Sequence, residues 1–150
     1  MKNQERDLLF RSAREAFRAR RYEEASKKLR RLTAAGSREP AHLALYGVTL
    51  VQDARTRREG IDVCQRAIRL GCREPELYLG LARAYFAMGS RLRAVQVLRQ
   101  GLRGSERPVE LLREIQRLSP RGKPVLGAFD RDHPLNKYLG RVRARLGGGG

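Results

Sequence analysis

A pair of helices joined by a tight turn is encoded in Pro75-Glu-Leu-Tyr-Leu-Gly-Leu-Ala82-Arg-Ala-Tyr85-Phe-Ala-Met-Gly89 and, just after it, in Ala94-Val-Gln-Val-Leu98-Arg-Gln-Gly101. Small residues return within this stretch at helical spacing, and larger apolar residues lie three or four positions from them. Two antiparallel helices can cross closely only where neither has a bulky side chain at the contact. The stretch therefore predicts a helical hairpin.

The same frame occurs twice more in the preceding sequence, about every 34 positions. Each unit has a small residue at the centre of its first helix and a second small residue in its second helix. Leu or Cys follows the second small residue by four positions. The three sets are Ala13, Ala25 and Leu29, then Gly47, Gly60 and Cys64, then Ala82, Ala94 and Leu98. A period of this length predicts stacked supersecondary units in place of one globular core. Such a stack favours a binding surface over catalysis.

The three units resemble the tetratricopeptide repeat (TPR) family. The third unit shows the pattern best, the first shares Tyr22-Glu-Glu-Ala25, and the second is degenerate; together they span roughly residues 5–104. The resemblance implies an all-α fold, an α-α superhelix of three TPR-like hairpins. The expected helices span residues 5–19, 22–35, 40–54, 57–70, 75–88 and 91–103, with Gly36 and Gly71 after helix ends and Pro40 and Pro75 at helix starts.

Three regions follow from this pattern. Residues 1–104 form the repeats, and residues 105–119 form a capping helix that Pro108 opens and whose Val109 and Leu112 face the last repeat. Residues 120–150 form a C-terminal docking tail with an extended apolar segment and a basic amphipathic helix. The tail's docking residues are Val125, Leu126, Phe129, Leu135 and Leu139. This tail either folds back onto the groove or the capping face, or docks onto another protein or an anionic surface.

The composition indicates a basic chain without a metal or membrane signature. The formal net charge is +17, and only five of the 33 basic residues are Lys. A charge of this size attracts anionic partners. Whether the excess of Arg serves a function or reflects a coding bias is left open. Cys64 and Cys72 fit neither a zinc site nor a disulfide framework, and no apolar run reaches the length of a membrane span. We therefore expect a soluble, cytoplasmic protein without cofactors, and the oligomeric state is left open.

In the TPR family, the first helices of successive repeats line a concave groove that receives a partner segment. The resemblance places the partner-binding residues on those three helices. They are Phe10, Arg14, Phe17 and Arg18 from the first, Ala44, Val48, Val51 and Gln52 from the second, and Leu79, Arg83 and Phe86 from the third. An apolar centre with Arg along it suits a hydrophobic segment with acidic flanks, because guanidinium pairs with carboxylate. Ordinary packing between repeats is the alternative role for the three Phe residues.

These observations predict a non-catalytic protein-protein interaction module, that is, an adaptor, scaffold or chaperone-like protein similar in architecture to the small TPR chaperones of bacterial secretion systems. Binding of nucleic acid or another polyanion through the Arg-rich surface is the alternative, supported by charge. No nucleic-acid-binding motif accompanies the charge. An enzyme is not expected, because neither His42 nor His133 has a visible constellation of Cys, Ser or carboxylate residues around it.

Overall fold

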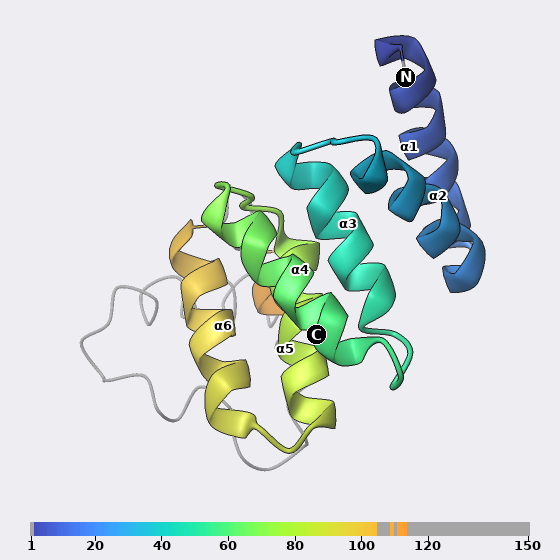
Figure 1. Cartoon of the computed structure of the whole chain (residues 1–150). Helices are drawn as coiled ribbons and strands as arrows, with labels where there is room; N and C mark the ends of the chain where they lie inside the picture. Colours follow the sequence, from blue (N-terminus) through green and yellow to red (C-terminus); the bar gives the residue numbers. More distant parts are fainter. Residues whose placement is uncertain (1, 105–108, 110, 114–150) are drawn as a thin grey trace, which may run out of the picture. The chain divides into compact units, whose positions relative to one another are not determined.

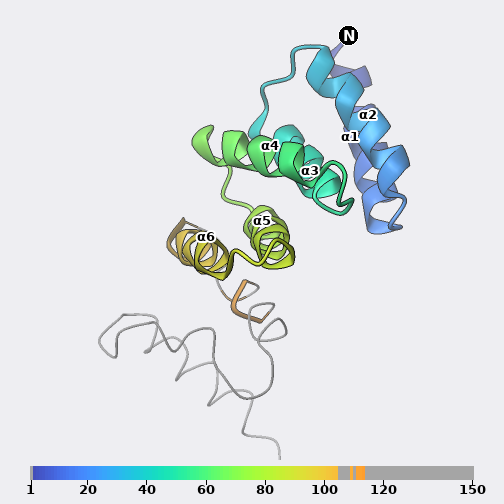
Figure 2. The ribbon, with the colours of Figure 1, turned by 60° about the horizontal axis from the view of Figure 1, so that its bottom comes forward.

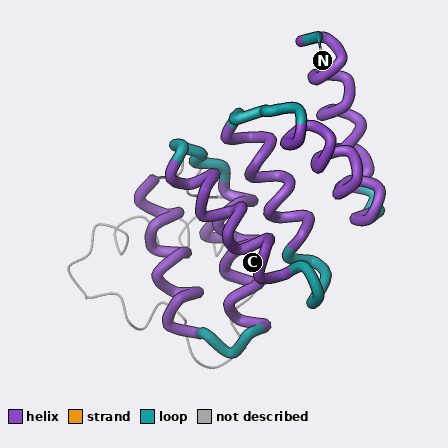
Figure 3. The backbone as a smooth tube through the Cα atoms, viewed as in Figure 1, coloured by secondary structure: helices purple, strands orange, loops and turns teal. Residues whose placement is uncertain are grey.

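The computed structural model describes residues 2–104, 109 and 111–113, all within one compact unit, Met1–Ile115. The described residues form helices joined by turns, and no strand occurs among them (Figure 3). From residue 2 to residue 104, the helices are α1 (Asn3–Arg18), α2 (Tyr22–Ala34), α3 (Pro40–Leu50), α4 (Arg57–Arg69), α5 (Pro75–Ala87) and α6 (Arg91–Gly104). The predicted all-α class is confirmed.

The helices pack as three hairpins in chain order. α1 packs against α2, α3 against α4, and α5 against α6, and neighbouring hairpins meet through α2–α3 and α4–α5 (Figure 1). The odd-numbered helices α1, α3 and α5 also contact one another in succession. Turned by 60°, the three hairpins follow each other from α1–α2 to α5–α6 (Figure 2). This is the stacking that the sequence period predicts.

Small residues permit the closest crossing, which lies between α3 and α4. A Cβ atom placed on Gly60 would lie 2.8 Å from the backbone nitrogen of Val51 and 2.9 Å from the backbone oxygen of Gly47. A Cβ atom on Gly47 would lie 2.5 Å from Cys64 Sγ. The Cys64 thiol is fully buried, and burial raises its pKa to about 12, so it packs as a small hydrophobe. The packing role predicted for Gly60 and Cys64 is confirmed.

The helix boundaries follow local backbone chemistry. Gly36 and Gly71 adopt φ values of +79° and +90°, in the left-handed region that favours glycine after a helix. Pro40 and Pro75 occupy the first helical position of α3 and α5, where the missing amide hydrogen removes no helical bond. These four assignments agree with the sequence analysis.

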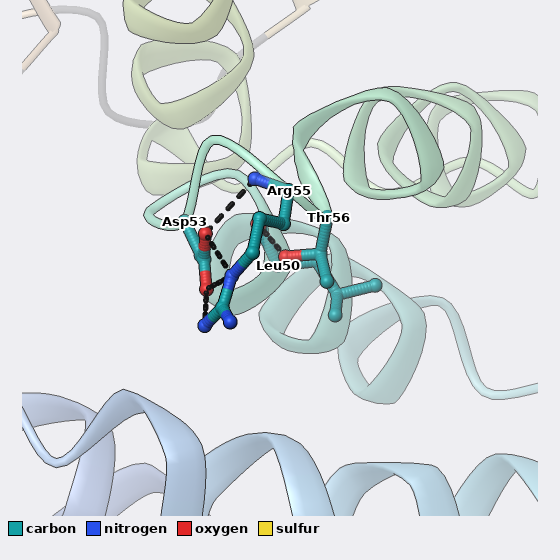
Figure 4. Close-up of polar contacts among 4 residues, drawn as sticks. All are labelled: Leu50, Asp53, Arg55 and Thr56. Carbon is teal, nitrogen blue, oxygen red and sulfur yellow. Dashed lines mark hydrogen bonds and ion pairs between the residues drawn. The ribbon is translucent and has the colours of Figure 1, made fainter.

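The second hairpin differs from its prediction at the end of α3. This helix ends at Leu50, not at residue 54, and residues 51–56 form a longer loop before α4. The Thr56 hydroxyl donates a hydrogen bond of 2.7 Å to the Leu50 carbonyl, and Arg55 folds back onto Asp53 with a 2.8 Å ion pair (Figure 4). The loop therefore satisfies the end of α3 with the side chain of its own last residue.

The start of the capping helix lies partly within the described residues. Residues 109 and 111–113 are helical. Leu111 is fully buried, and a Cβ atom on Gly101 of α6 would lie 2.9 Å from Leu111 Cδ2. Leu112 is also buried, as predicted, whereas Val109 is 37% exposed, so Leu111 and not Val109 faces α6. The remainder of the predicted cap and the whole predicted tail, with its docking residues Val125, Leu126, Phe129, Leu135 and Leu139, lie outside the described residues.

Candidate partner-binding groove

A cleft of about 350 Å³ opens along the three odd-numbered helices. We call it the groove. Its lining comes from the C-terminal half of α1, the middle of α3 and the start of α5 with the residue before it. These residues are Arg14, Phe17, Arg18, Ala44, Leu45, Val48, Glu74, Glu76 and Leu77. The first helices of all three repeats thus contribute to one cleft.

The floor of the groove is apolar. Ala44, Val48 and Leu77 are buried, while Phe17 and Leu45 are partly exposed and remain available to a ligand. Gly80 fixes the approach of α5 to α3 at this point, because a Cβ atom there would lie 2.9 Å from Val48 Cγ1. A small residue on α5 therefore brings Leu77 and Val48 into one continuous apolar surface.

One side of the groove is basic. Arg14 and Arg18 lie one turn apart on α1, and both side chains are exposed. The Arg14 guanidinium lies 5.0 Å from the centre of the Phe10 ring, a cation–π contact that restricts its position. Arg18 makes no ion pair with any residue that the structure describes. Its charge is thus open to a partner, and it also suits the negative end of the α1 dipole.

The opposite side is acidic, which the sequence analysis overlooked. Glu74 is the N-cap residue of α5, and Glu76 lies in the first turn of that helix. Within the described part of the chain, neither carboxylate makes an ion pair. Both are placed favourably at the positive end of the α5 dipole. The sequence does contain a signal for this acidic side of the groove. Two carboxylates flank Pro75 at the start of a helix that was predicted to line the groove.

Five of the predicted partner-binding residues line the groove together: Arg14, Phe17, Arg18, Ala44 and Val48. Phe10 instead packs on His42, with ring centres 4.2 Å apart. Gln52 Nε2 donates a 3.0 Å hydrogen bond to the Val48 carbonyl. The remaining four also lie outside this cleft, with Val51 and Leu79 buried, Phe86 partly buried and Arg83 exposed.

His42 has polar partners, which corrects the sequence analysis. Nδ1 lies 2.7 Å from Ser37 Oγ in a buried hydrogen bond, and Nε2 lies 3.5 Å from a Glu39 carboxylate oxygen. The three residues follow the Ser–His–carboxylate order of a hydrolytic triad, but with the two ring nitrogens exchanged. However, Ser37 and His42 are only 7% and 3% exposed, the Phe10 ring covers the imidazole, and none of these residues lines the groove. The cluster therefore joins the first hairpin to α3 as a structural contact.

We expect His42 to make the fold sensitive to acid. Burial lowers the pKa of His42 below its ordinary value of 6.5, while Glu39 and Asp7 raise it and Arg6 lowers it by smaller amounts. The unfolded chain therefore binds this proton more tightly. Its contribution to stability is complete above about pH 6.5 and is lost as the pH falls below that value. In urea unfolding at about pH 7.5 and about pH 5.5, the wild type should lose more stability than His42→Gln. Equal losses in both proteins would contradict this assignment.

The basic residues of α2 are partly neutralised within that helix. Lys27 pairs with Glu23 at 2.8 Å, and Glu24 pairs with both Lys28 and Arg21. Lys27 and Lys28 lower the pKa values of the two carboxyls mainly through these side-chain hydrogen bonds. The surface that α2 could offer to a polyanion is therefore less basic than the sequence suggests.

The comparisons give no family assignment: no protein-family model matches the chain, and no curated protein matches it significantly. None of the helices described is both long and apolar enough to cross a membrane. Over the same residues, no group of three His, Cys, Asp or Glu side chains is arranged to hold a metal ion. The groove is thus the feature on which a functional assignment depends.

Proposed function

We propose that this chain is a TPR-like adaptor that binds a segment of another protein in the groove. The observation that supports this function best is the cleft itself, which all three hairpins line with an apolar floor between charged sides. Such a cleft has a shape that a short helix or an extended peptide can fill. Burial of apolar groups on the floor would supply affinity, and the charged sides would supply specificity.

The surface of the groove is suited to reversible binding. Phe17 and Leu45 are partly exposed, so a partner would remove their remaining surface from water. The floor beneath them rests on buried residues of α3 and α5 and needs no rearrangement for binding. The two cysteines are free and buried, which fits a reducing compartment, and we therefore propose that the adaptor works in the cytoplasm.

A selection from a phage-displayed library of random peptides tests this function. Peptides enriched on the wild-type protein should bind Leu45→Asp at least about tenfold more weakly, because a carboxylate on the floor must be desolvated without a partner. Leu92→Asp is the matched control, since Leu92 is 73% exposed on α6 and does not line the groove. Circular dichroism and thermal unfolding establish that both variants are folded. Enriched peptides that bind Leu45→Asp as well as the wild type would refute the proposal.

The same variants address the alternative function. A fluorescent single-stranded oligonucleotide that binds through the Arg-rich surface should lose affinity steeply with added salt and should not distinguish Leu45→Asp from Leu92→Asp. Enriched peptides anchored on the apolar floor should retain most of their affinity at moderate salt.

A further inference from the structure

The charges on the groove are arranged as two opposed sides. Arg14 and Arg18 both come from the C-terminal half of α1, whereas Glu74 and Glu76 both come from the start of α5. α3 supplies apolar residues to the floor, and it comes between α1 and α5 in the succession of helices that line the groove. A ligand that spans the floor from α1 to α5 therefore meets positive charge at one end and negative charge at the other.

We infer that the groove selects a bipolar segment, with an apolar centre, an acidic end against α1 and a basic end against α5. This inference rests on the proposed function and names the class of its partner. It also revises the expectation of a partner with acidic flanks on both sides. A second acidic flank would be placed against Glu74 and Glu76, and like charges brought together across an interface oppose binding.

The net charge of the whole chain would point to a different ligand. A formal charge of +17 attracts any acidic peptide at long range. At moderate salt, that long-range attraction is screened beyond about 10 Å, while contacts inside the groove persist. Ligand preference measured under these conditions reports the local charges of the groove and not the overall charge.

Three fluorescent peptides of equal length provide the probes. Each has the same central leucines; the bipolar peptide has aspartates at one end and lysines at the other, and the remaining two have aspartates or lysines at both ends. In fluorescence anisotropy at moderate salt, the wild type should bind the bipolar peptide about fivefold to tenfold more tightly than either of the others. Each of the other two peptides places one of its charged ends against a side of the groove with the same charge, which opposes binding.

Reversal of one side should change the preference without removing binding. Arg14→Glu/Arg18→Glu makes both sides acidic, and this variant should prefer the peptide with lysines at both ends. Glu74→Lys/Glu76→Lys makes both sides basic, and this variant should prefer the peptide with aspartates at both ends. Arg14, Arg18 and Glu76 are exposed and Glu74 is half-buried, so these substitutions replace no residue of the apolar core. Thermal unfolding verifies that each variant is folded.

The outcomes separate this inference from the proposed function. If Leu45→Asp abolishes binding of all three peptides but reversal of a side leaves their ranking unchanged, the groove is the docking site and the bipolar preference is wrong. The same conclusion follows if the wild type prefers the peptide with aspartates at both ends. If Leu45→Asp binds all three peptides like the wild type, the groove is not the docking site and both proposals fail.

Discussion

Replacing Gly60 with Ala should lower the free energy of unfolding by about 2–3 kcal/mol, although Ala is the better helix former. Helix propensity alone would stabilise the variant by about 1 kcal/mol. The new methyl group would, however, lie 2.8 Å from the Val51 nitrogen and 2.9 Å from the Gly47 oxygen, both backbone atoms at the α3 crossing. Backbone atoms cannot rotate away as a side chain can, so α3 and α4 must separate and lose buried contacts. Thermal unfolding should show a decrease of about 4–12 °C in the midpoint temperature.

Gly104→Ala is the matched control for this prediction. Gly104 is also helical, at the end of α6, but its added methyl group would lie 3.7 Å from Tyr78 Oη. This distance is an ordinary van der Waals contact, so Gly104→Ala should leave stability unchanged or raise it by up to about 1 kcal/mol. A Gly60→Ala protein as stable as the Gly104→Ala protein would show that α3 and α4 do not cross this closely.

The hairpin stack could be predicted from the sequence because its determinants are local and repeated. Ala13, Ala82 and Gly47 occur in one frame, and each is buried at the position that the frame assigns. The early end of α3 could not be predicted in this way. The apolar pattern continues to Val51, whereas the helix ends at Leu50 and the Thr56 hydroxyl, at the end of the loop, stabilises this end by bonding the Leu50 carbonyl. Such a contact depends on the path of the loop and not on periodicity.

The groove could be predicted only in part. The frame placed Arg14, Phe17, Arg18 and Val48 on the first helices, and these residues do meet in one cleft. It could not show that the cleft is confined to one end of α5, because that depends on how far each hairpin is rotated relative to the previous one. Glu74 lines the groove although it precedes its helix, and the helical repeat frame assigns no position to a residue outside the helix.

Replacing Leu29 with Ala should destabilise the first hairpin by about 2–5 kcal/mol. Leu29 is fully buried in α2, and loss of a large buried aliphatic side chain combines lost transfer energy with the cost of a cavity. The α1–α2 hairpin contacts mainly the next hairpin in the stack, through α2–α3 and α1–α3. In a linear array, stability depends on each unit and its immediate neighbours. Hydrogen exchange measured by mass spectrometry should therefore show loss of protection in α1 and α2, with α5 and α6 still protected.

Leu8→Ala provides the control within the same hairpin. Leu8 is 65% exposed on α1, so its removal creates no cavity and should change stability by no more than about 0.5 kcal/mol. Because both substitutions replace leucine with alanine, a difference in stability between the two variants is due to burial and not to residue type. If Leu29→Ala reduced protection equally in all six helices, the hairpins would unfold as a single cooperative core. The groove would then be a depression on that core and not a cleft between separately stable units.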